Sequence, residues 1–126
     1  MIYLASPYSH DDPSVRELRF QAACRATAEL INQGHVVFSP IVYGHPLTKH
    51  GVATEWTAWE SFARKQIAIA DEMLVLCVDG WEDSAGIREE IYLAEISNTP
   101  IDSLSPRSIP ALAKWPCSSI NTEPRR

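Results

Sequence analysis

Cysteine is scarce in this chain of 126 residues, and the three that occur, Cys24, Cys77 and Cys117, lie far apart. They form neither a C-x-x-C pair nor a Cys/His pattern with the spacing of a metal site, and an odd number cannot complete a set of disulfides. Reduced thiols are typical of cytoplasmic proteins. We therefore expect a cytoplasmic location and no metal site.

Long apolar runs and clusters of basic residues are also missing. No stretch approaches the roughly 18 apolar residues of a membrane span, and the opening MIYLASPYSH lacks the charged leader of a signal peptide. The formal net charge is −5, and Lys and Arg are scattered along the chain. We expect neither a membrane nor a nucleic acid polymer as a partner, although a helix N-terminus can hold a small anion.

The apolar residues that are present alternate between strand and helix patterns. Short apolar runs at IYLAS, HVVFSP and MLVLCV predict buried strands, and PID is a candidate start of a fourth. Apolar residues at three- and four-residue spacing predict helices over 13–33, 54–70 and 84–97, with a short last helix at PALAKW. We expect a loop over 41–52, and residues 116–126 are typical of a tail or a subunit-contact arm.

This alternation, in a chain of one-domain length, predicts the fold. Strands that alternate with helices form parallel sheets with helices on both faces. The predicted class is α/β, a Rossmann-like (flavodoxin-like) three-layer sandwich with a parallel sheet of four or five strands, formed by residues 1–126 as a single domain. In such sheets ligands bind at the carboxyl ends of the strands. The loops SPYSH, SPIVYGH and DGWEDSAG follow the first three strands, so we expect them to converge on one cleft.

The segment after the third strand, DGWEDSAGIREEIYLAE, carries six carboxylates in seventeen residues. At about 100° per residue, Glu90 falls within the apolar arc of the predicted helix, whereas Glu89 and Glu95 fall outside it. An inward acid near a helix N-terminus is partly desolvated, which suits a nucleophile. The alternative is that Glu90 lies at the edge of the arc and only pairs with a basic side chain.

Residues around Glu90 allow both structural and functional interpretations. Ser84 can cap the helix or donate to a phosphate or sugar oxygen, and Gly86 lets backbone N–H groups approach a ligand. Asp71 lies just before the third strand, where either turn chemistry at a helix end or a functional role would explain it. His45, in the predicted loop, is a candidate contact for phosphate or base, although loop histidines often have no such role.

Three motifs resemble the nucleoside 2-deoxyribosyltransferase superfamily, which includes the nucleoside 5'-monophosphate N-glycosidases. The motifs are IYLASP, ADEMLVLCV and SAGIREEIYLA, and the resemblance covers about residues 1–101. Ser84, Gly86, Glu90 and Ala94 match the spacing of the family's catalytic helix. The sequence departs from the family at Ser6 and Tyr92, where glycine is usual.

The resemblance implies that Glu90 is the nucleophile and that Asp71 assists it. It also implies that Tyr3 lines the sugar site and that Ser84 faces a substrate phosphate, as in the monophosphate N-glycosidases. Ser6, Gly86 and His45 are the further expected substrate contacts. A carboxylate at C1' can stabilise or capture an oxocarbenium-like sugar without a metal or redox group, so we expect no cofactor.

The leading hypothesis is therefore an enzyme that cleaves or transfers the N-glycosidic bond of a small-molecule nucleoside, deoxynucleoside or nucleoside 5'-monophosphate. Because family members complete their sites across subunits, we expect a dimer or higher homo-oligomer. One alternative is a nucleotide-binding or sensory module without turnover. Another is a structural homo-oligomer, in which four tryptophans form core or a subunit contact: Trp56, Trp59, Trp81 and Trp115.

Overall fold

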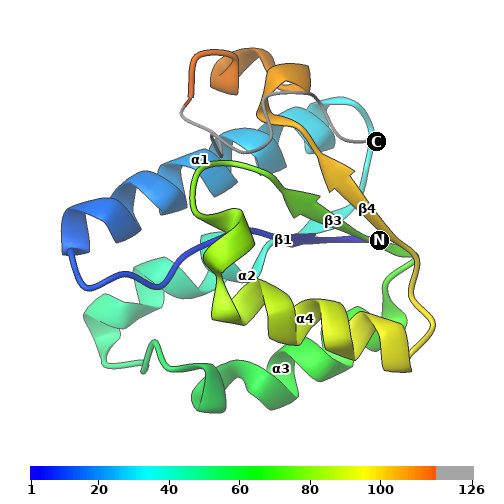
Figure 1. Cartoon of the computed structure of the whole chain (residues 1–126), viewed down its shortest axis with the longest axis horizontal. Coiled ribbons are helices and arrows are strands. Elements are labelled where there is room, and N and C mark those ends of the chain that lie inside the picture. Colours follow the sequence, from blue (N-terminus) through cyan, green and yellow to red (C-terminus); the bar gives the residue numbers. More distant parts are fainter. Residues whose placement is uncertain (116–126) are drawn as a thin grey trace.

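The computed structural model describes residues 1–115, which are built around a parallel sheet of four strands (Figure 1). The strands are β1 (Ile2–Ala5), β2 (Val37–Phe38), β3 (Glu72–Leu76) and β4 (Ile101–Leu104). Their order is β2-β1-β3-β4, and all three pairings are parallel. The predicted α/β, Rossmann-like fold is confirmed, with four strands. The predicted tail over 116–126, which contains Cys117, lies outside the described residues.

Four α-helices connect or follow these strands: α1 (Pro13–Asn32), α2 (Pro40–Gly44), α3 (Trp56–Ile69) and α4 (Ala85–Ile96). Three of them lie where the apolar spacing predicts helices. Side chains cap two of the three at the N-terminus, where Asp12 accepts a hydrogen bond from the backbone N–H of Ser14 and Ser84 from that of Ile87. The predicted last helix is a short 3-10 turn, Pro110–Leu112.

The prediction of a loop over 41–52 is wrong, because α2 and a 3-10 helix, His45–His50, occupy most of this segment. The start signal for α2 lies in the sequence: the Ser39 hydroxyl accepts a hydrogen bond from the N–H of Val42, and Pro40 takes the first helical position. The glycines and the second proline of this segment obscured that signal. The helical turns here place His45 against α1 and the loop after β1.

Alternate strand side chains face two separate cores, which makes the protein a three-layer sandwich. Tyr3, Ala5 and Val75 belong to the core under α3 and α4. Leu4 and Leu76 belong to the core under α1 and the last 3-10 turn. Figure 1 shows α1 above the sheet and α3 and α4 below it. Glu90 and Tyr3 therefore share one layer, between α4 and the sheet.

The strand order places a topological switch point between β1 and β3. The chain moves from β1 outward to β2 and then returns to the other side of β1 to form β3 and β4. At such a point the connections diverge to opposite faces of the sheet and leave a crevice at the carboxyl ends of the strands. The loops after β1 and β3 start beside this crevice.

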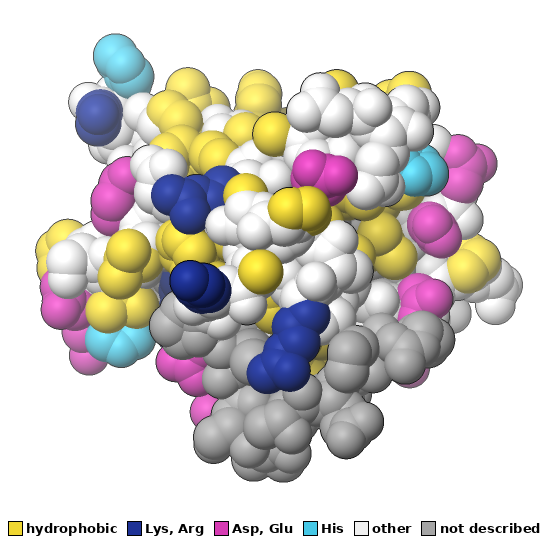
Figure 2. Space-filling view, turned by 90° about the horizontal axis from the view of Figure 1, so that it is seen from above, with side chains coloured by type: hydrophobic (Ala, Val, Ile, Leu, Met, Phe, Trp, Pro, Cys, Tyr) yellow, Lys and Arg dark blue, Asp and Glu magenta, His cyan; other side chains and the backbone are white. Residues whose placement is uncertain are grey.

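Figure 2 shows one face of the molecule, on which Lys and Arg side chains are interspersed with apolar and acidic ones. Within residues 1–115, no helix combines the length and the apolar character that crossing a bilayer requires.

Candidate active site

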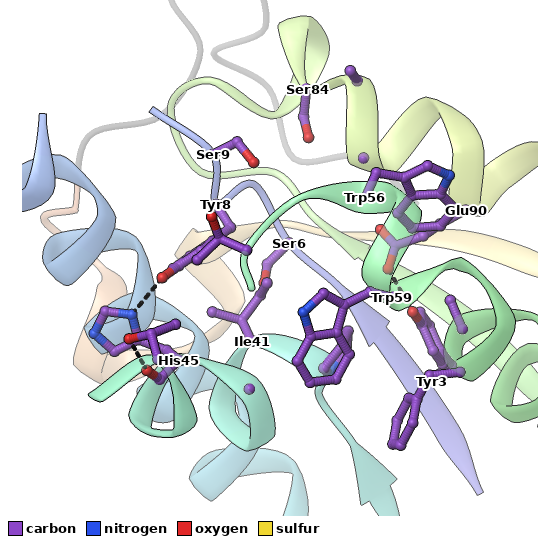
Figure 3. A pocket seen from close by; sticks show the side chains of 18 residues that line it. Tyr3, Ser6, Tyr8, Ser9, Ile41, His45, Trp56, Trp59, Ser84 and Glu90 are labelled. Carbon is purple, nitrogen blue, oxygen red and sulfur yellow. Dashed lines mark hydrogen bonds between the residues drawn. The ribbon is translucent and has the colours of Figure 1, made fainter. Parts of the chain in front are cut away.

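A pocket opens at the carboxyl ends of β1, β2 and β3, with an empty volume of about 860 Å³ that includes its open mouth (Figure 3). The predicted convergence of three loops on one cleft is confirmed. The loop after β1 contributes Ser6, Tyr8 and Ser9, and the segment after β2 contributes Ile41 and His45. The segment after β2 also contributes Pro40, Gly44 and Thr48. The remaining wall comes from α3, α4 and the residues just before them, with Tyr3 from within β1: Thr54, Trp56, Trp59, Phe62, Ala63, Ser84, Ala85, Gly86 and Glu90.

Glu90 is the acid of this pocket. Its side chain is buried at 6% exposure, while the neighbouring Glu89 and Glu95 are exposed. This confirms the helical-wheel prediction that only Glu90 of the three faces inward. The phenol of Tyr3 donates a hydrogen bond of 2.5 Å to its Oε2 atom. The pair joins the middle of β1 to the second turn of α4, so the sheet fixes the position of the carboxyl group.

Burial governs the protonation of this pair. Desolvation raises the pKa of Glu90 to about 8, and the hydrogen bond from Tyr3 lowers it against that effect. Desolvation also raises the pKa of Tyr3 well above its ordinary value, and the charge of Glu90 adds to this shift. Tyr3 therefore stays a phenol and a hydrogen-bond donor. The carboxyl group of Glu90 titrates near physiological pH, which is typical of groups that take part in catalysis.

Ser84 and Gly86 lie at the N-terminus of α4, on the rim of the pocket. The Ser84 hydroxyl accepts a hydrogen bond of 3.1 Å from the N–H of Ile87, so its capping role is confirmed. Its own proton can still be donated to a ligand. A Cβ atom added to Gly86 would meet only the Ser84 Oγ atom, at 3.8 Å. Packing therefore does not require glycine at position 86, and the space beside its backbone is open.

Ser6 supplies a buried polar group that also lines the pocket. Its side chain is 5% exposed, and among the described residues its hydroxyl has no hydrogen-bond partner. An unpaired buried hydroxyl costs free energy that a polar ligand atom would recover. Ser6, one of the expected substrate contacts, thus lies in the wall of the pocket.

The structure does not bring Asp71 to the pocket. Asp71 precedes the first residue of β3, at the amino end of the sheet, and 85% of its side chain is exposed. Its carboxylate pairs with the amino group of Met1, and its backbone N–H donates to the Met1 carbonyl oxygen. The catalytic role predicted for Asp71 conflicts with this position, because ligands of parallel sheets bind at the opposite end of the strands. We do not keep Asp71 among the candidate catalytic residues.

His45 lines the pocket, but both of its ring nitrogens already have partners. Its Nδ1 atom lies 2.6 Å from the phenol oxygen of Tyr8, and its Nε2 atom lies 3.0 Å from Oε1 of Glu17. Its ring also packs on Phe20, with 4.3 Å between ring centroids. The predicted ligand contact of His45 therefore stays a prediction, and Tyr8, which the sequence analysis did not single out, lies beside it in the wall of the pocket.

An aromatic wall is the second feature that the sequence analysis missed. Trp56 and Trp59, at the start of α3, line the pocket rather than forming only core or a subunit contact. The indole N–H of Trp59 donates to the Ala53 carbonyl oxygen at 2.8 Å. Gly44 makes room for this ring, since a Cβ atom there would lie 2.9 Å from it. Flat apolar side chains of this kind suit the face of a nucleobase.

These features define a Rossmann-like α/β protein with a buried acid in a pocket at its switch point. The chain belongs to a family described as a domain of unknown function (DUF1937), whose model matches residues 1–105. The match spans all four strands, all four α-helices and every residue that lines the pocket. A comparison with curated proteins finds no match.

Proposed function

We propose that this chain cleaves or transfers the N-glycosidic bond of a nucleoside, a deoxynucleoside or a nucleoside 5'-monophosphate, with Glu90 as nucleophile. One observation carries the proposal: Glu90 is the only charged side chain that is buried among residues 1–115, and it lies in the wall of the pocket. A buried carboxyl group whose hydrogen-bond partner is a neutral phenol destabilises the fold when it ionises, so its presence at a ligand site favours a chemical role. The resemblance of SAGIREEIYLA to a catalytic helix supports the same residue.

The geometry suits attack on an anomeric carbon. Tyr3 holds one carboxyl oxygen of Glu90, which leaves the other oxygen to approach C1' of a sugar. As the base departs, positive charge develops on the sugar, and a carboxylate in a poorly solvated site stabilises that charge strongly. Water or a second base then resolves the glycosyl–enzyme intermediate. Trp56 and Trp59 offer apolar faces to the base.

A 5'-phosphate would fit at the opposite end of such a substrate, at the N-terminus of α4. The partial positive charge of that terminus, the open backbone beside Gly86 and the Ser84 hydroxyl all favour an anion there. This part of the proposal separates a monophosphate substrate from a nucleoside.

The proposal is tested by base release from a panel of nucleosides, deoxynucleosides and their 5'-monophosphates, followed by chromatography. Release from at least one compound is expected, with the added base exchanged into the product if the enzyme is a transferase. Ligand-dependent melting without release of base from any compound would instead favour a nucleotide-binding module.

Replacing Ser84 with alanine should weaken binding of the monophosphate by roughly 1–3 kcal/mol, because a charge-assisted hydrogen bond is lost. Binding of the matching nucleoside should change much less. Isothermal titration with both ligands measures the difference, and Ser84→Thr, which keeps the cap and the donor, is the matched control. Equal losses for the two ligands would mean that Ser84 acts only as a helix cap.

The pH dependence of kcat/KM should follow Glu90. The nucleophile is the carboxylate, so kcat/KM is expected to rise as the pH passes through about 8. Tyr3 lowers the pKa of Glu90, so Tyr3→Phe should move this rise to higher pH and reduce kcat/KM at pH 7 about 10- to 100-fold. At strongly alkaline pH the two enzymes should converge. A loss that stays the same at every pH would contradict this role of Tyr3.

A homo-oligomer remains part of the proposal. Exposed apolar side chains on α3 and α4, Ile69, Tyr92 and Ile96, support a subunit contact on that layer.

A further inference from the structure

A second hydrogen-bonded cluster of polar side chains extends from the wall of the pocket, apart from Tyr3 and Glu90. It joins Tyr8, in the loop after β1, to His45, at the end of α2, and to Glu17, on α1. Figure 3 shows Tyr8 and His45 on one side of the pocket and Tyr3 with Glu90 on the other. A sugar held between them would have its two faces toward different groups.

The partners in this cluster limit which atoms can carry protons. Hydrogen bonds from Gln21 and from His45 lower the pKa of Glu17, so its carboxylate is an acceptor. The Nε2 atom of His45 is then a donor to Glu17. In neutral His45 the Nδ1 atom accepts the phenol proton of Tyr8, whereas in the imidazolium form Nδ1 donates to the Tyr8 oxygen. Protonation of His45 thus frees the O–H of Tyr8 to donate into the pocket.

Tyr8 is held as a donor rather than as a phenolate. Burial raises its pKa, against the guanidinium of Arg16, which lowers it; the carboxylate of Glu17 raises it further. Lys49, on the 3-10 helix, is the other charged group that acts on this cluster, through Glu17. Phe20 fixes the plane of the imidazole by packing on it. The phenol of Tyr8 and the imidazole of His45 are therefore both held in place.

The proposed reaction requires such a group. A nucleobase leaves poorly as an anion, so a proton donor at the base lowers the barrier. The titratable side chains among the residues that line the pocket are Tyr3, Tyr8, His45 and Glu90. Tyr3 donates its hydrogen bond to Glu90, and Glu90 acts as nucleophile, while Asp71 lies at the other end of the sheet. Tyr8 with His45 is the pair that remains.

We propose that Tyr8 is a second catalytic residue of this pocket, which donates its phenol proton to the departing base, and that His45 and Glu17 are positioning residues that resupply this proton. The inference rests on the proposed function. In the first step the C1'–N bond breaks and its electron pair stays on the base nitrogen. A carboxylate oxygen of Glu90 bonds to C1', the base takes the Tyr8 proton, and the Tyr8 oxygen takes the Nδ1 proton of the His45 imidazolium.

The second step restores the pair. A water oxygen bonds to C1' and the bond between C1' and Glu90 breaks, which returns the carboxylate. The proton lost by water passes to the Tyr8 oxygen, and the Tyr8 proton returns to Nδ1 of His45. In transfer, the incoming base gives up its proton by the same route. Glu17 accepts the Nε2–H of His45 throughout and balances the charge of the imidazolium.

Leaving groups of different basicity test this role. The substrates are the nucleoside or nucleotide that the wild-type enzyme cleaves and the 4-nitrophenyl glycoside of the same sugar, whose leaving group departs as an anion without a proton. Tyr8→Phe should lower kcat for the natural substrate by about 10²- to 10⁴-fold and leave kcat for the nitrophenyl glycoside within a few-fold. Glu17→Gln should lower kcat for the natural substrate about tenfold and likewise leave kcat for the nitrophenyl glycoside within a few-fold.

Glu89→Gln, on the exposed side of α4, is the matched control for Glu17→Gln and should leave both rates unchanged. Thermal unfolding checks that each variant is folded. Equal losses with both leaving groups, or none with either, would overturn the role of Tyr8 while leaving Glu90 and the glycosidic reaction in place. A wild-type enzyme that releases neither base nor 4-nitrophenol would overturn the proposed function, and the role of Tyr8 with it.

Discussion

Glu90→Ala is expected to reduce base release on the order of 10⁴-fold or more, because the variant lacks the group that captures the anomeric carbon. The remaining pocket should still bind its ligand, since Ser6, Tyr8, Trp59 and the N-terminus of α4 are unchanged. Chromatography of the released base and ligand-dependent melting of the same variant measure the two properties separately.

Glu89→Ala is the matched control for this experiment. Glu89 is adjacent in sequence but exposed, about 100° away around the helix, so its replacement should leave the rate nearly unchanged. A 2-fluoro-2-deoxyribosyl substrate should trap the intermediate, because fluorine destabilises the transition state for its breakdown. Mass spectrometry is expected to find the sugar on Glu90. Full activity of Glu90→Ala, or a label confined to Glu89, would contradict the assignment.

The sequence predicts Glu90 well because helical periodicity is a local property. Glu89 and Glu90 have the same chemistry, yet the apolar arc set by Ile87 and its neighbours faces only Glu90 toward the sheet. The alternation of strand and helix patterns predicts the carboxyl-edge location in a similar way, since parallel sheets have one such edge at a switch point. In both cases the signal lies in the spacing of apolar residues within individual strands and helices.

Asp71 shows where a motif match misleads. The resemblance assigns it to catalysis, whereas counting along ADEMLVLCV places it before the strand, and the structure agrees with the counting. The strand begins at the next residue, so the carboxylate faces the amino edge and the Met1 amine. The position of Asp71 relative to β3, and not its residue type, therefore excludes it from the pocket.

The cluster of Tyr8, His45 and Glu17 could not be predicted from any one segment. Its residues are separated by 37 and 28 positions in the chain, and they meet only because α2 and the 3-10 helix after it turn His45 toward α1. The aromatic pocket wall has the same origin. Trp56 and Trp59 are apolar residues of an amphipathic helix, and the absence of a side chain at Gly44 is what lets the Trp59 ring sit against α2. Such contacts depend on how elements pack.

Glu90 should also make the stability of the protein depend on pH. In the folded state burial raises its pKa to about 8, whereas the unfolded chain has a value near 4.5. The folded state therefore holds a proton that the unfolded state releases between these two values, and the stabilisation present below pH 4.5 is lost as the pH rises toward 8. The loss amounts to between about 1 and 2 kcal/mol for each pH unit in this window.

Glu90→Gln should remove this dependence, because the amide keeps the shape and the acceptor for Tyr3 but does not ionise. Near pH 5 the variant and the wild-type protein are expected to unfold at similar denaturant concentrations, and near pH 8.5 the variant should be more stable by several kcal/mol. Glu89→Gln should follow the wild-type curve, since its side chain is exposed. Parallel curves for wild type and Glu90→Gln across this range would show that the acid is not buried in the folded protein. The carboxyl group of Glu90 is therefore expected to reduce the stability of the fold while it serves the reaction. For this reason Glu90→Gln should stabilise the protein at alkaline pH and abolish base release.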